Sequence, residues 1–558
     1  MNVFTRIIFY LLLIVTIADC SKKSGGGNTT PPPAPNYNLQ SWSVNNTASL
    51  TDYYSVNTNP VIKFNFSEAV NKSTVTSSTL TFNEGTVGNI AYNVSYEHAD
   101  STIVISPSAP LKGLTKYVIA LTSGIKSVKN GNLIGVTTIN ITTALDSSRK
   151  FPAISEDSLL TLVQKQTFKY FWDFGHPVCG LARERSSDLT TVTTGGSGFG
   201  IMAIPVAINR GFISRAQGLT RLQTIVAFLK NTAPKFHGAF SHWMNGNTGA
   251  VIPFGTNDDG ADIVETSYLM MGLLTARQYF DGTDAGETTL RDDINTLYAA
   301  VDWNWFRQNG KNVLYWNWSP NTGFAVNVPV QGWNETLITY VMAASSPTHA
   351  IPKAVYDSGF ARNGAIVNNS AYYGYNLPLG PAYGGPLFFS HYSFMGIKPT
   401  GLTDAYANYQ TQTVNHSLIN YNYCKTNPKN YFGYSDSCWG LTASDIMNGY
   451  TASSPTNDVG VIAPTAAISS LPYTPTESMK ALKFFYYVLG DKIWKDYGFT
   501  DAFSLNQVWY DGAFLAIDQG PQIVMIENYR TGLIWNLFTS CPEIKTGMKN
   551  LGFSAPYL

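Results

Sequence analysis

Hydrophobic and polar positions alternate in the first part of the chain. Apolar residues recur at every second position in short runs at 61–66, 102–105, 117–121 and 138–141, and turns that carry Asn and Gly separate these runs. A period of two is typical of strands with one buried face. We therefore predict that residues 37–146 form a small β-sandwich.

The hydrophobic period changes to that of a helix at about Glu156. Apolar spacing predicts helices at 157–173, 197–210, 214–231, 262–280, 288–308, 334–344, 352–363, 402–422, 458–469, 475–489 and 521–540, with a short one at 385–395. The loops between them are long and rich in Gly, Pro, Asn and aromatic residues, which a tight up-and-down bundle does not need. For residues 154–558 we predict a mainly α fold, an (α/α)6 toroid made of two concentric rings of helices.

The first 20 residues have the pattern of a lipoprotein signal peptide. Residues 7–18 form an apolar run that is too short to span a bilayer. The run leads to Ile-Ala-Asp-Cys, which resembles a bacterial lipobox, although Asp19 replaces the usual small residue. We therefore expect an exported protein that a lipid on Cys20 anchors to the periplasmic face of a bacterial membrane, with the cell surface as the alternative. Residues 21–36 are expected to be a flexible linker.

Composition narrows the class of partner. With 36 basic and 36 acidic residues the net charge is zero, so we expect no nucleic-acid partner. Aromatic residues make up 13% of the chain, which suits stacking on sugar rings and equally suits a large helical core. No Cys/His cluster has zinc spacing, and we expect no metal, no cofactor and a monomer. Whether Cys424 and Cys438, the nearest cysteine pair, form a disulfide stays open.

An acidic stretch precedes the apolar segment 268–274. Asp258, Asp262 and Glu265 are spaced i, i+4, i+7, so a helix over this stretch would place three carboxylates on one face. Carboxylates held close together have their pKa values pushed apart, which acid/base cleavage of a glycosidic bond requires. The alternative is that these acids simply favour the first turn of a helix.

A second acid, Glu335, stands in a similar position. It follows Gly332-Trp333-Asn334 and precedes the apolar segment 337–342, so it is a candidate catalytic acid. Capping of its own helix is the alternative.

Loops that combine polar and aromatic residues, at 385–393 and 509–521, have the composition of sugar subsites. The side chains expected to bind substrate are Trp333, His391, Tyr392, Trp439 and Asp511. Asp518 and Gln519 are instead expected to cap the last helix, which would begin near Pro521. Glu527 is expected to form an internal ion pair with Arg530, three residues on.

Several motifs from residue 154 onward carry a family resemblance. They are Gly332-Trp333-Asn334-Glu335 with Ser346-Pro347-Thr348-His349, His391-Tyr392-Ser393-Phe394-Met395-Gly396, Cys438-Trp439-Gly440-Leu441-Thr442-Ala443-Ser444-Asp445, Ala463-Pro464-Thr465-Ala466-Ala467, Pro472-Tyr473-Thr474-Pro475 with Glu477-Ser478-Met479-Lys480-Ala481-Leu482, and Ile517-Asp518-Gln519-Gly520-Pro521. Together they resemble the glycoamylase-like family, which includes glycoside hydrolase family 144, the bacterial β-1,2-glucanases. Residues 66–70 and 114–119 resemble bacterial Ig-like modules.

The resemblance implies an (α/α)6 fold and hydrolysis of β-1,2-glucan without a metal or cofactor. The family's acidic residues fall on Asp258, Asp262, Glu265 and Glu335. Lys398 departs from the family pattern, because an acid is expected there in many relatives.

Our mechanistic hypothesis is inverting hydrolysis by an endo-acting enzyme. Glu335 would protonate the leaving oxygen, Asp262 or Glu265 would activate water, and Asp258 would tune their pKa values. The alternatives are exo-acting release of sophorose, hydrolysis of another glucan linkage, and a lipoprotein that binds glycans without cleaving them.

Overall fold

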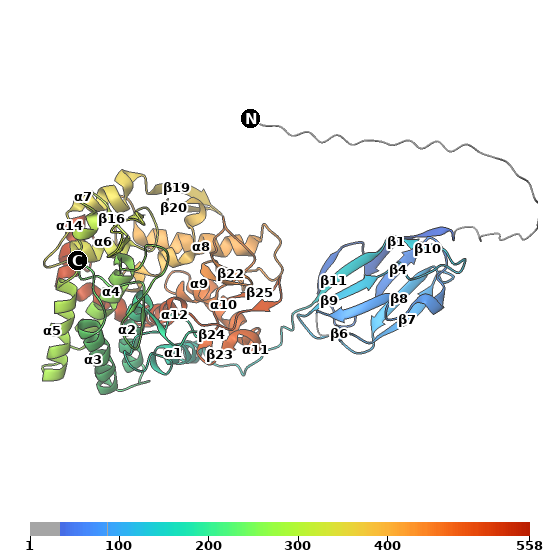
Figure 1. Cartoon of the computed structure of the whole chain (residues 1–558), viewed down its shortest axis with the longest axis horizontal. Coiled ribbons are helices and arrows are strands. Elements are labelled where there is room, and N and C mark those ends of the chain that lie inside the picture. Colours follow the sequence, from blue (N-terminus) through green and yellow to red (C-terminus); the bar gives the residue numbers. More distant parts are fainter. Residues whose placement is uncertain (1–33, 86–87) are drawn as a thin grey trace, which may run out of the picture. The chain divides into compact units, whose positions relative to one another are not determined.

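The computed structural model describes residues 34–85 and 88–558, which form two compact units (Figure 1). The first unit ends at Thr143 and leaves out Gly113–Thr115, which belongs with Ala144–Leu558 in the second. The expected signal peptide, Cys20 and most of the linker lie outside the described residues. Within the described ranges, no helix is both long enough and apolar enough to cross a membrane.

Two β-sheets make up the first unit. One has the strand order β10–β1–β4–β8–β7 with β2 beside β1, and the other has the order β3–β11–β9–β5–β6. The strands are β1 (Asn36–Val44), β2 (Thr47–Ala48), β3 (Asp52–Val56), β4 (Ile62–Phe66), β5 (Leu80–Glu84), β6 (Gly88–Asn89), β7 (Tyr92–Glu97), β8 (Thr102–Pro107), β9 (Lys116–Leu121), β10 (Asn132–Ile134) and β11 (Thr137–Thr143).

Alternation along the strands builds the core of this unit. In β4, Ile62, Phe64 and Phe66 are buried, whereas the two residues between them are only partly buried. Phe64 joins Phe82 and Ile119, from the other sheet, in one hydrophobic cluster. The predicted β-sandwich is therefore confirmed.

The second unit is mainly helical. Its helices are α1 (Glu156–Trp172), α2 (Thr194–Asn209), α3 (Arg215–Asn231), α4 (Ile263–Tyr279), α5 (Ala285–Ala299), α6 (Leu337–Ala344), α7 (Lys353–Val355), α8 (Tyr409–Thr426), α9 (Pro464–Ser469), α10 (Pro475–Tyr487), α11 (Gly490–Ile493), α12 (Ala516–Arg530), α13 (Leu533–Ser540) and α14 (Pro542–Leu551).

Short strands in the loops complete the second unit. They are β12 (Thr191–Thr193), β13 (Trp243–Asn245), β14 (Val251–Ile252), β15 (Ala261–Asp262), β16 (Leu314–Tyr315), β17 (Asn317–Trp318), β18 (Pro329–Val330), β19 (Val367–Tyr372), β20 (Tyr375–Leu379), β21 (Ala443–Ile446), β22 (Gly449–Ala452), β23 (Trp494–Lys495), β24 (Gly498–Phe499), β25 (Phe503–Ser504) and β26 (Trp509–Tyr510).

Four predicted helices differ clearly from the structure. The segment 352–363 is divided into the short α7, a π-helix at Tyr356–Phe360 and a 3-10 turn at Arg362–Gly364. The segment 385–395 forms two 3-10 turns, Leu387–Ser390 and Ser393–Met395, instead of an α-helix. The helix expected at 288–308 ends at Ala299. The helix expected at 521–540 begins earlier and is divided, because Gly532 adopts a left-handed conformation with φ of 71° between α12 and α13.

Burial separates inner helices from outer ones. The first 14 residues of α4 and all eight residues of α6 are buried, whereas α5 buries one face only. A helix that is apolar on all sides lies inside a protein. The inner helices pack in the order α9, α12, α2, α4, α6, and α6 then contacts the turn at Ser393–Met395. A hydrogen bond from His391, beside that turn, to Ser470, directly after α9, closes the order.

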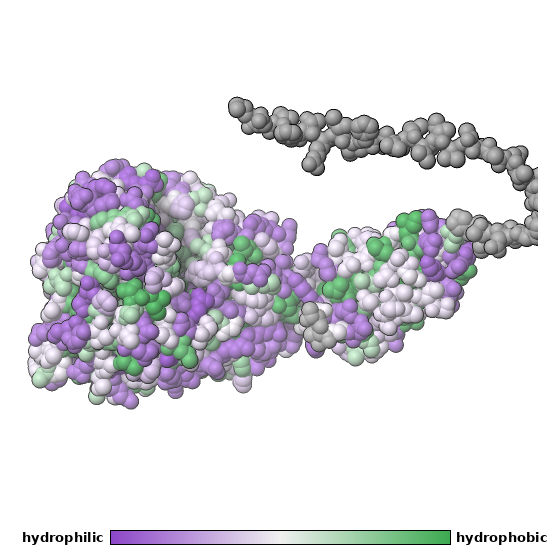
Figure 2. Space-filling view, in the orientation of Figure 1, coloured by the Kyte–Doolittle hydropathy of each residue, from purple (hydrophilic) through white to green (hydrophobic). Residues whose placement is uncertain are grey.

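Two glycines permit the closest helix contact. A Cβ atom on Gly198 of α2 would lie 2.2 Å from a backbone oxygen of α4, and one on Gly272 of α4 would lie 2.2 Å from a backbone oxygen of α2. The backbones of the two helices therefore touch, which fixes the N-terminal end of α4 beside that of α2. Hydrophilic residues cover most of the face of this unit that Figure 2 shows, with small hydrophobic patches between them.

Candidate active site

A cavity of about 370 Å³ lies in the helical unit. Its acidic lining residues are Glu184, Glu265 and Glu335, and its basic ones are Arg185 and His242. Its aromatic lining consists of Trp243, Phe254, Tyr268, Trp316, Tyr392 and Tyr450. Such a mixture of aromatic faces and a few convergent charges is typical of a small-ligand or sugar site.

The acidic stretch is not the helical stripe that its spacing suggested. Helix α4 begins only at Ile263, so Asp258 lies in the preceding loop and Asp262 is the N-cap residue. Asp262 also belongs to β15, which pairs with β17. These carboxylates are therefore brought together by a loop, a short strand and a first helical turn.

Asp262 has both of its carboxylate oxygens occupied. Oδ1 accepts hydrogen bonds from the backbone N–H groups of Val264 and Glu265, each at 2.9 Å. Oδ2 accepts from Nε1 of Trp316 at 3.2 Å and lies 2.9 Å from Nδ1 of His242. These contacts cap α4 and hold His242, so Asp262 is suited to a structural and orienting role.

Glu265 lines the cavity from the first turn of α4. Its Oε2 accepts a hydrogen bond of 2.8 Å from the backbone N–H of Gly195, at the start of α2. A Cβ atom at position 195 would lie only 2.6 Å from that oxygen, so glycine permits the contact. Burial raises the pKa of Glu265, while the nearby His242 lowers it.

Glu335 precedes α6 and does not cap it. The N-cap residue is Thr336, and α6 begins at Leu337. The backbone oxygen of Glu335 accepts hydrogen bonds from the hydroxyl groups of Tyr268 and Ser393, so its position is fixed by neighbouring inner elements. Burial raises the pKa of Glu335 to about 7. At neutral pH a large fraction of this carboxyl group therefore keeps the proton that a general acid donates.

Asp258 is partly buried near the other acids. Its Oδ1 accepts a hydrogen bond of 2.9 Å from Nδ2 of Asn317, in the strand that pairs with β15. Burial and the charge of Asp262 raise the pKa of Asp258 to about 6.

His242 supplies a positive charge that sequence analysis missed. Burial disfavours its charged form, but Glu265, Asp262 and Asp258 outweigh this effect and raise its pKa to about 9. The ring is therefore an imidazolium at neutral pH and partly neutralises the acids around it. No motif surrounds His242 in the sequence, and only the fold brings it to them.

A second acidic group lies outside the lining of the cavity, in the loop that follows α11 and in the first turn of α12. The carboxyl groups of Asp501 and Asp518 face each other, and burial raises the pKa of Asp518 to about 7. Because repulsion between two facing carboxylates makes it unfavourable for both to be charged, one of them holds a proton. Asp518 lies inside α12, which begins at Ala516, so the expected cap ahead of Pro521 is wrong.

Asp501 and two further acids have the spacing of a cation site. In the described part of the chain, Asp445, Asp501 and Asp511 each place one carboxylate oxygen within 4.8 Å of the others. Oxygen ligands of this kind suit hard cations such as Ca²⁺ and Mg²⁺. A salt bridge of 3.1 Å from Arg185 to Asp445 already supplies one positive charge to this group.

The expected substrate-binding residues fall into two sets. Tyr392 lines the cavity, and Asp511 is partly buried beside Asp445. Trp333, His391 and Trp439 are at most 4% exposed and do not line it. These three pack inside the helical unit, because their aromatic neighbours and backbone partners fill the space that a sugar would need.

The contacts of these three residues show what they do instead. Trp333 packs against Phe394, with ring centres 6.0 Å apart. The indole of Trp439 donates a hydrogen bond to the backbone oxygen of Glu477 at 3.2 Å. Burial lowers the pKa of His391 to about 3, so this ring is neutral.

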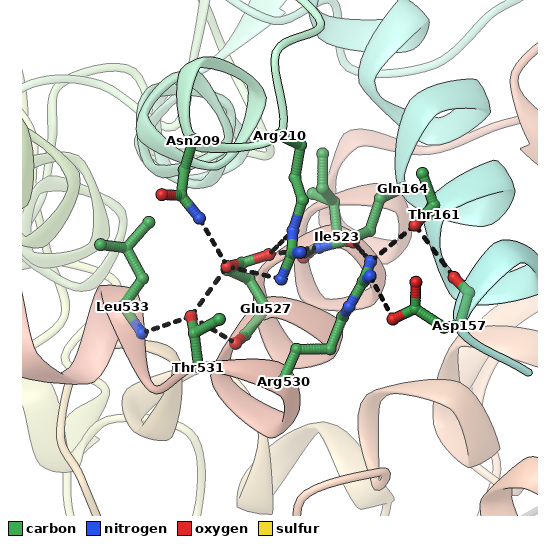
Figure 3. Close-up of polar contacts among 10 residues, drawn as sticks. All are labelled: Asp157, Thr161, Gln164, Asn209, Arg210, Ile523, Glu527, Arg530, Thr531 and Leu533. Carbon is green, nitrogen blue, oxygen red and sulfur yellow. Dashed lines mark hydrogen bonds and ion pairs between the residues drawn. The ribbon is translucent and has the colours of Figure 1, made fainter.

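Glu527 belongs to a structural network outside the cavity (Figure 3). Its carboxylate accepts hydrogen bonds of 2.7 and 2.9 Å from Arg210. Arg530, the partner that the spacing suggested, instead donates to Asp157 and Gln164 of α1. The internal ion pair is therefore present, but its partner is Arg210, directly after α2, and not the neighbour in the sequence.

The cysteines of the described residues are all free and buried, including Cys424 and Cys438. Both lie in the hydrophobic cluster around Trp439.

The site combines a buried acid that has a raised pKa with a second carboxylate at the same aromatic cavity, on a mainly helical scaffold. This combination is typical of the class of acid/base glycoside hydrolases. The glycoamylase family model matches residues 327–542, and the model of the bacterial Ig-like domain matches residues 40–143.

Solved structures of relatives agree with this class. The endo-β-1,2-glucanase of Chitinophaga pinensis, solved with sophorotriose and glucose, is 52% identical, covers 73% of this chain and 100% of its own, and has a TM-score of 0.71. The β-1,2-glucanase of Parabacteroides distasonis is 36% identical over 93% of this chain and 73% of its own, with a TM-score of 0.70.

A third relative is the exo β-1,2-glucooligosaccharide sophorohydrolase (non-reducing end) of Parabacteroides distasonis. It is 43% identical over 429 residues, which are 73% of this chain and 59% of the length of that protein. The chain belongs to the glycoamylase-like family, in glycoside hydrolase family 144.

Proposed function

We propose that the protein hydrolyses β-1,2-glucan. The observation that carries this proposal is that Glu265 and Glu335, from two different inner elements, line one aromatic cavity in unequal surroundings. Two carboxyl groups at one cavity, one acting as acid and the other as base, are what a glycosidase needs. The names of the relatives, endo-β-1,2-glucanase and sophorohydrolase, support β-1,2-glucan as the substrate.

Glu335 is the general acid in this proposal. Its pKa of about 7 keeps it protonated over the mildly acidic range, so that it can protonate the leaving oxygen. Glu265 is the better candidate for activating water, because Asp262 has both oxygens engaged and Glu265 faces the cavity beside the positive His242. Asp258 tunes the charge of the group.

The reaction is proposed to invert the anomeric carbon. Glu265 lies in the first turn of α4, and Glu335 lies just ahead of α6. The two carboxyl groups of an inverting pair must leave room for a water molecule, which requires a separation of ~6.5–9.5 Å. Proton NMR of the first product tests this: the α-anomer is expected from a β-linked substrate, and a β-anomer would establish retention.

Incubation with linear β-1,2-glucan, followed by sugar analysis, tests the activity. Wild-type protein is expected to release β-1,2-linked glucooligosaccharides, and E335Q is expected to lose at least about 100-fold in kcat. E156Q makes the same chemical change at an exposed surface ion pair and should keep full activity. Cleavage of starch but not of β-1,2-glucan would contradict the proposed substrate.

Endo action is our proposal for the cleavage pattern. It is supported by the 52% identity to an endo-β-1,2-glucanase over the whole of that chain. Exo action is the second candidate, supported by the 43% identity to the sophorohydrolase. A broad early ladder of products would indicate endo action, and sophorose alone would indicate exo action.

We further propose that the helical unit is an (α/α)6 toroid. The closed packing order of its buried elements supports this arrangement, with α1, α5 and α10 packed on them from outside. Lipid anchoring through Cys20, a periplasmic location and a monomeric state remain proposals from the sequence. Metabolic labelling with a fatty acid, compared between the wild type and C20A, tests the anchor.

A further inference from the structure

Two large aromatic side chains on the wall of the cavity remain exposed. Phe254 is 51% exposed and Tyr450 is 47% exposed, although both line the cavity. The other aromatic side chains of the lining are more deeply buried. Exposed aromatic faces at a cavity are costly to leave in water, and a ligand with apolar faces can cover them.

The two side chains come from segments that precede different inner helices. Phe254 lies in the loop that leads into α4, and Tyr450 lies in β22, ahead of α9. In the packing order α9, α12, α2, α4, α6 and the turn at Ser393–Met395, α4 and α9 are separated by two elements in either direction. On one path of this order α6 lies between α4 and α9, so the segment that carries Glu335, ahead of α6, comes between the segments that carry Phe254 and Tyr450.

Stacking fixes the orientation of Phe254. Its ring lies 4.1 Å from the ring of His242 at an interplanar angle of 24°, and 4.9 Å from the ring of Trp243 at 66°. His242 is itself held by Asp262. One face of Phe254 is therefore supported by the same imidazolium that balances the acids, which leaves the rest of the ring available.

The hairpin β21–β22 fixes Tyr450. Its cross-strand neighbour is Asp445, which forms a salt bridge with Arg185 and donates its backbone N–H to Asp501. Burial of the hydroxyl end of Tyr450 raises its pKa, and the charges of the nearby acids Asp518 and Asp501 raise it further. The hairpin is thus held near its turn, directly opposite Tyr450, while Tyr450 itself stays exposed at the cavity.

We propose that Phe254 and Tyr450 are sugar-stacking platforms that bind glucosyl units on opposite sides of Glu335. This inference rests on the proposed function and adds the residues that bind the chain on each side of the cleaved bond. A planar ring covers the apolar C–H face of a pyranose, and both platforms are preorganised by the contacts just described. A chain that engages both platforms extends on both sides of the catalytic acid.

Binding is measured by calorimetry in the E335Q background, so that the ligand is not cleaved. The ligands are β-1,2-linked glucooligosaccharides of increasing length, and the variants are F254A and Y450A. We expect each variant to lose about 3- to 10-fold in affinity for the long oligosaccharides. F254L and Y450F are milder changes, and Y450F is expected to keep the affinity because it retains the ring.

M447A is the matched control for the hairpin. Met447 is 45% exposed between β21 and β22 but does not line the cavity. Its substitution is expected to leave binding unchanged. The thermal transition of every variant is recorded, so that loss of the fold is distinguished from loss of binding.

Steady-state kinetics with the active forms of F254A and Y450A complete the test. We expect KM for long β-1,2-glucan to rise by a similar factor while kcat changes by less than about twofold, because stacking away from the bond binds substrate and transition state alike. Unchanged affinity in E335Q/F254A and E335Q/Y450A would overturn the platforms but not the proposed function. Failure of E335Q to bind any β-1,2-glucan, together with no cleavage by the wild type, would overturn both.

Discussion

Glu335 should destabilise the folded protein at neutral and alkaline pH, and its replacement by Gln should remove this effect. The folded state raises the pKa of Glu335 from 4.5 to about 7, chiefly by burial. The folded protein therefore holds this proton more tightly than the unfolded chain does. The contribution of protonated Glu335 to the free energy of unfolding is fully present below pH 4.5 and is lost as the pH rises to about 7.

The magnitude follows from the change in pKa. A rise from 4.5 to about 7 corresponds to at most about 3 kcal/mol of unfolding free energy at pH 8. For the helical unit of roughly 420 residues, the unfolding entropy is about 0.9 kcal/mol per degree. E335Q, which carries no charge at any pH, should therefore melt about 3 °C above the wild type at pH 8 and at the same temperature at pH 4.5.

Differential scanning fluorimetry between pH 4.5 and pH 8 measures this difference. E156Q serves as the control, because Glu156 forms a surface ion pair with Lys483. The difference in melting temperature between E156Q and the wild type should not increase as the pH rises. If the difference between E335Q and the wild type stays constant across this range, Glu335 is not a carboxyl group with a raised pKa, and its assignment as the general acid fails.

Three further predictions concern charge and burial. The alkaline limb of kcat/KM should have an apparent pKa near 7, because activity requires protonated Glu335, and a limb above pH 9 in the measured profile would contradict this. D262N should lower the melting temperature more than D284N does, because both residues are N-caps but only Asp262 also holds the partly buried ring of His242; equal losses would refute that role. R210M should destabilise by about 3–5 kcal/mol in chemical unfolding because it leaves Glu527 buried without its ion pair, and a loss below about 1 kcal/mol would show that the remaining partners suffice.

Local patterns were sufficient for many elements of the fold, although α14 and strands such as β1, β5 and β7 were not predicted individually. Alternation in 61–66, 102–105, 117–121 and 138–141 located strands β4, β8, β9 and β11, because one face of each strand must be buried. Most inner and outer helices were found by their apolar spacing for the same reason. The errors lie at ends and breaks: a helix at 385–395 was expected where two 3-10 turns occur.

Candidate acids were also visible in the sequence, but their roles were not. Glu265 and Glu335 line the cavity as expected. Asp262 carries the same charge as Glu265 and stands only three residues before it. Its oxygens are nevertheless occupied by contacts with N–H groups of α4, with His242 and with Trp316. Whether a carboxylate caps a helix or faces a cavity depends on backbone contacts that spacing alone does not contain.

Only the tertiary structure assembled the rest of the site. His242, Arg185, Asp501 and Tyr450 have no sequence motif that marks them, because their neighbours are distant in the chain and meet through the closed order of inner elements. The sequence by itself determined the periodic elements and the inventory of acids, since burial acts on local patterns. Solvent exclusion and the partners of each charge, which set the pKa of Glu335, arise only when the helices close around one cavity.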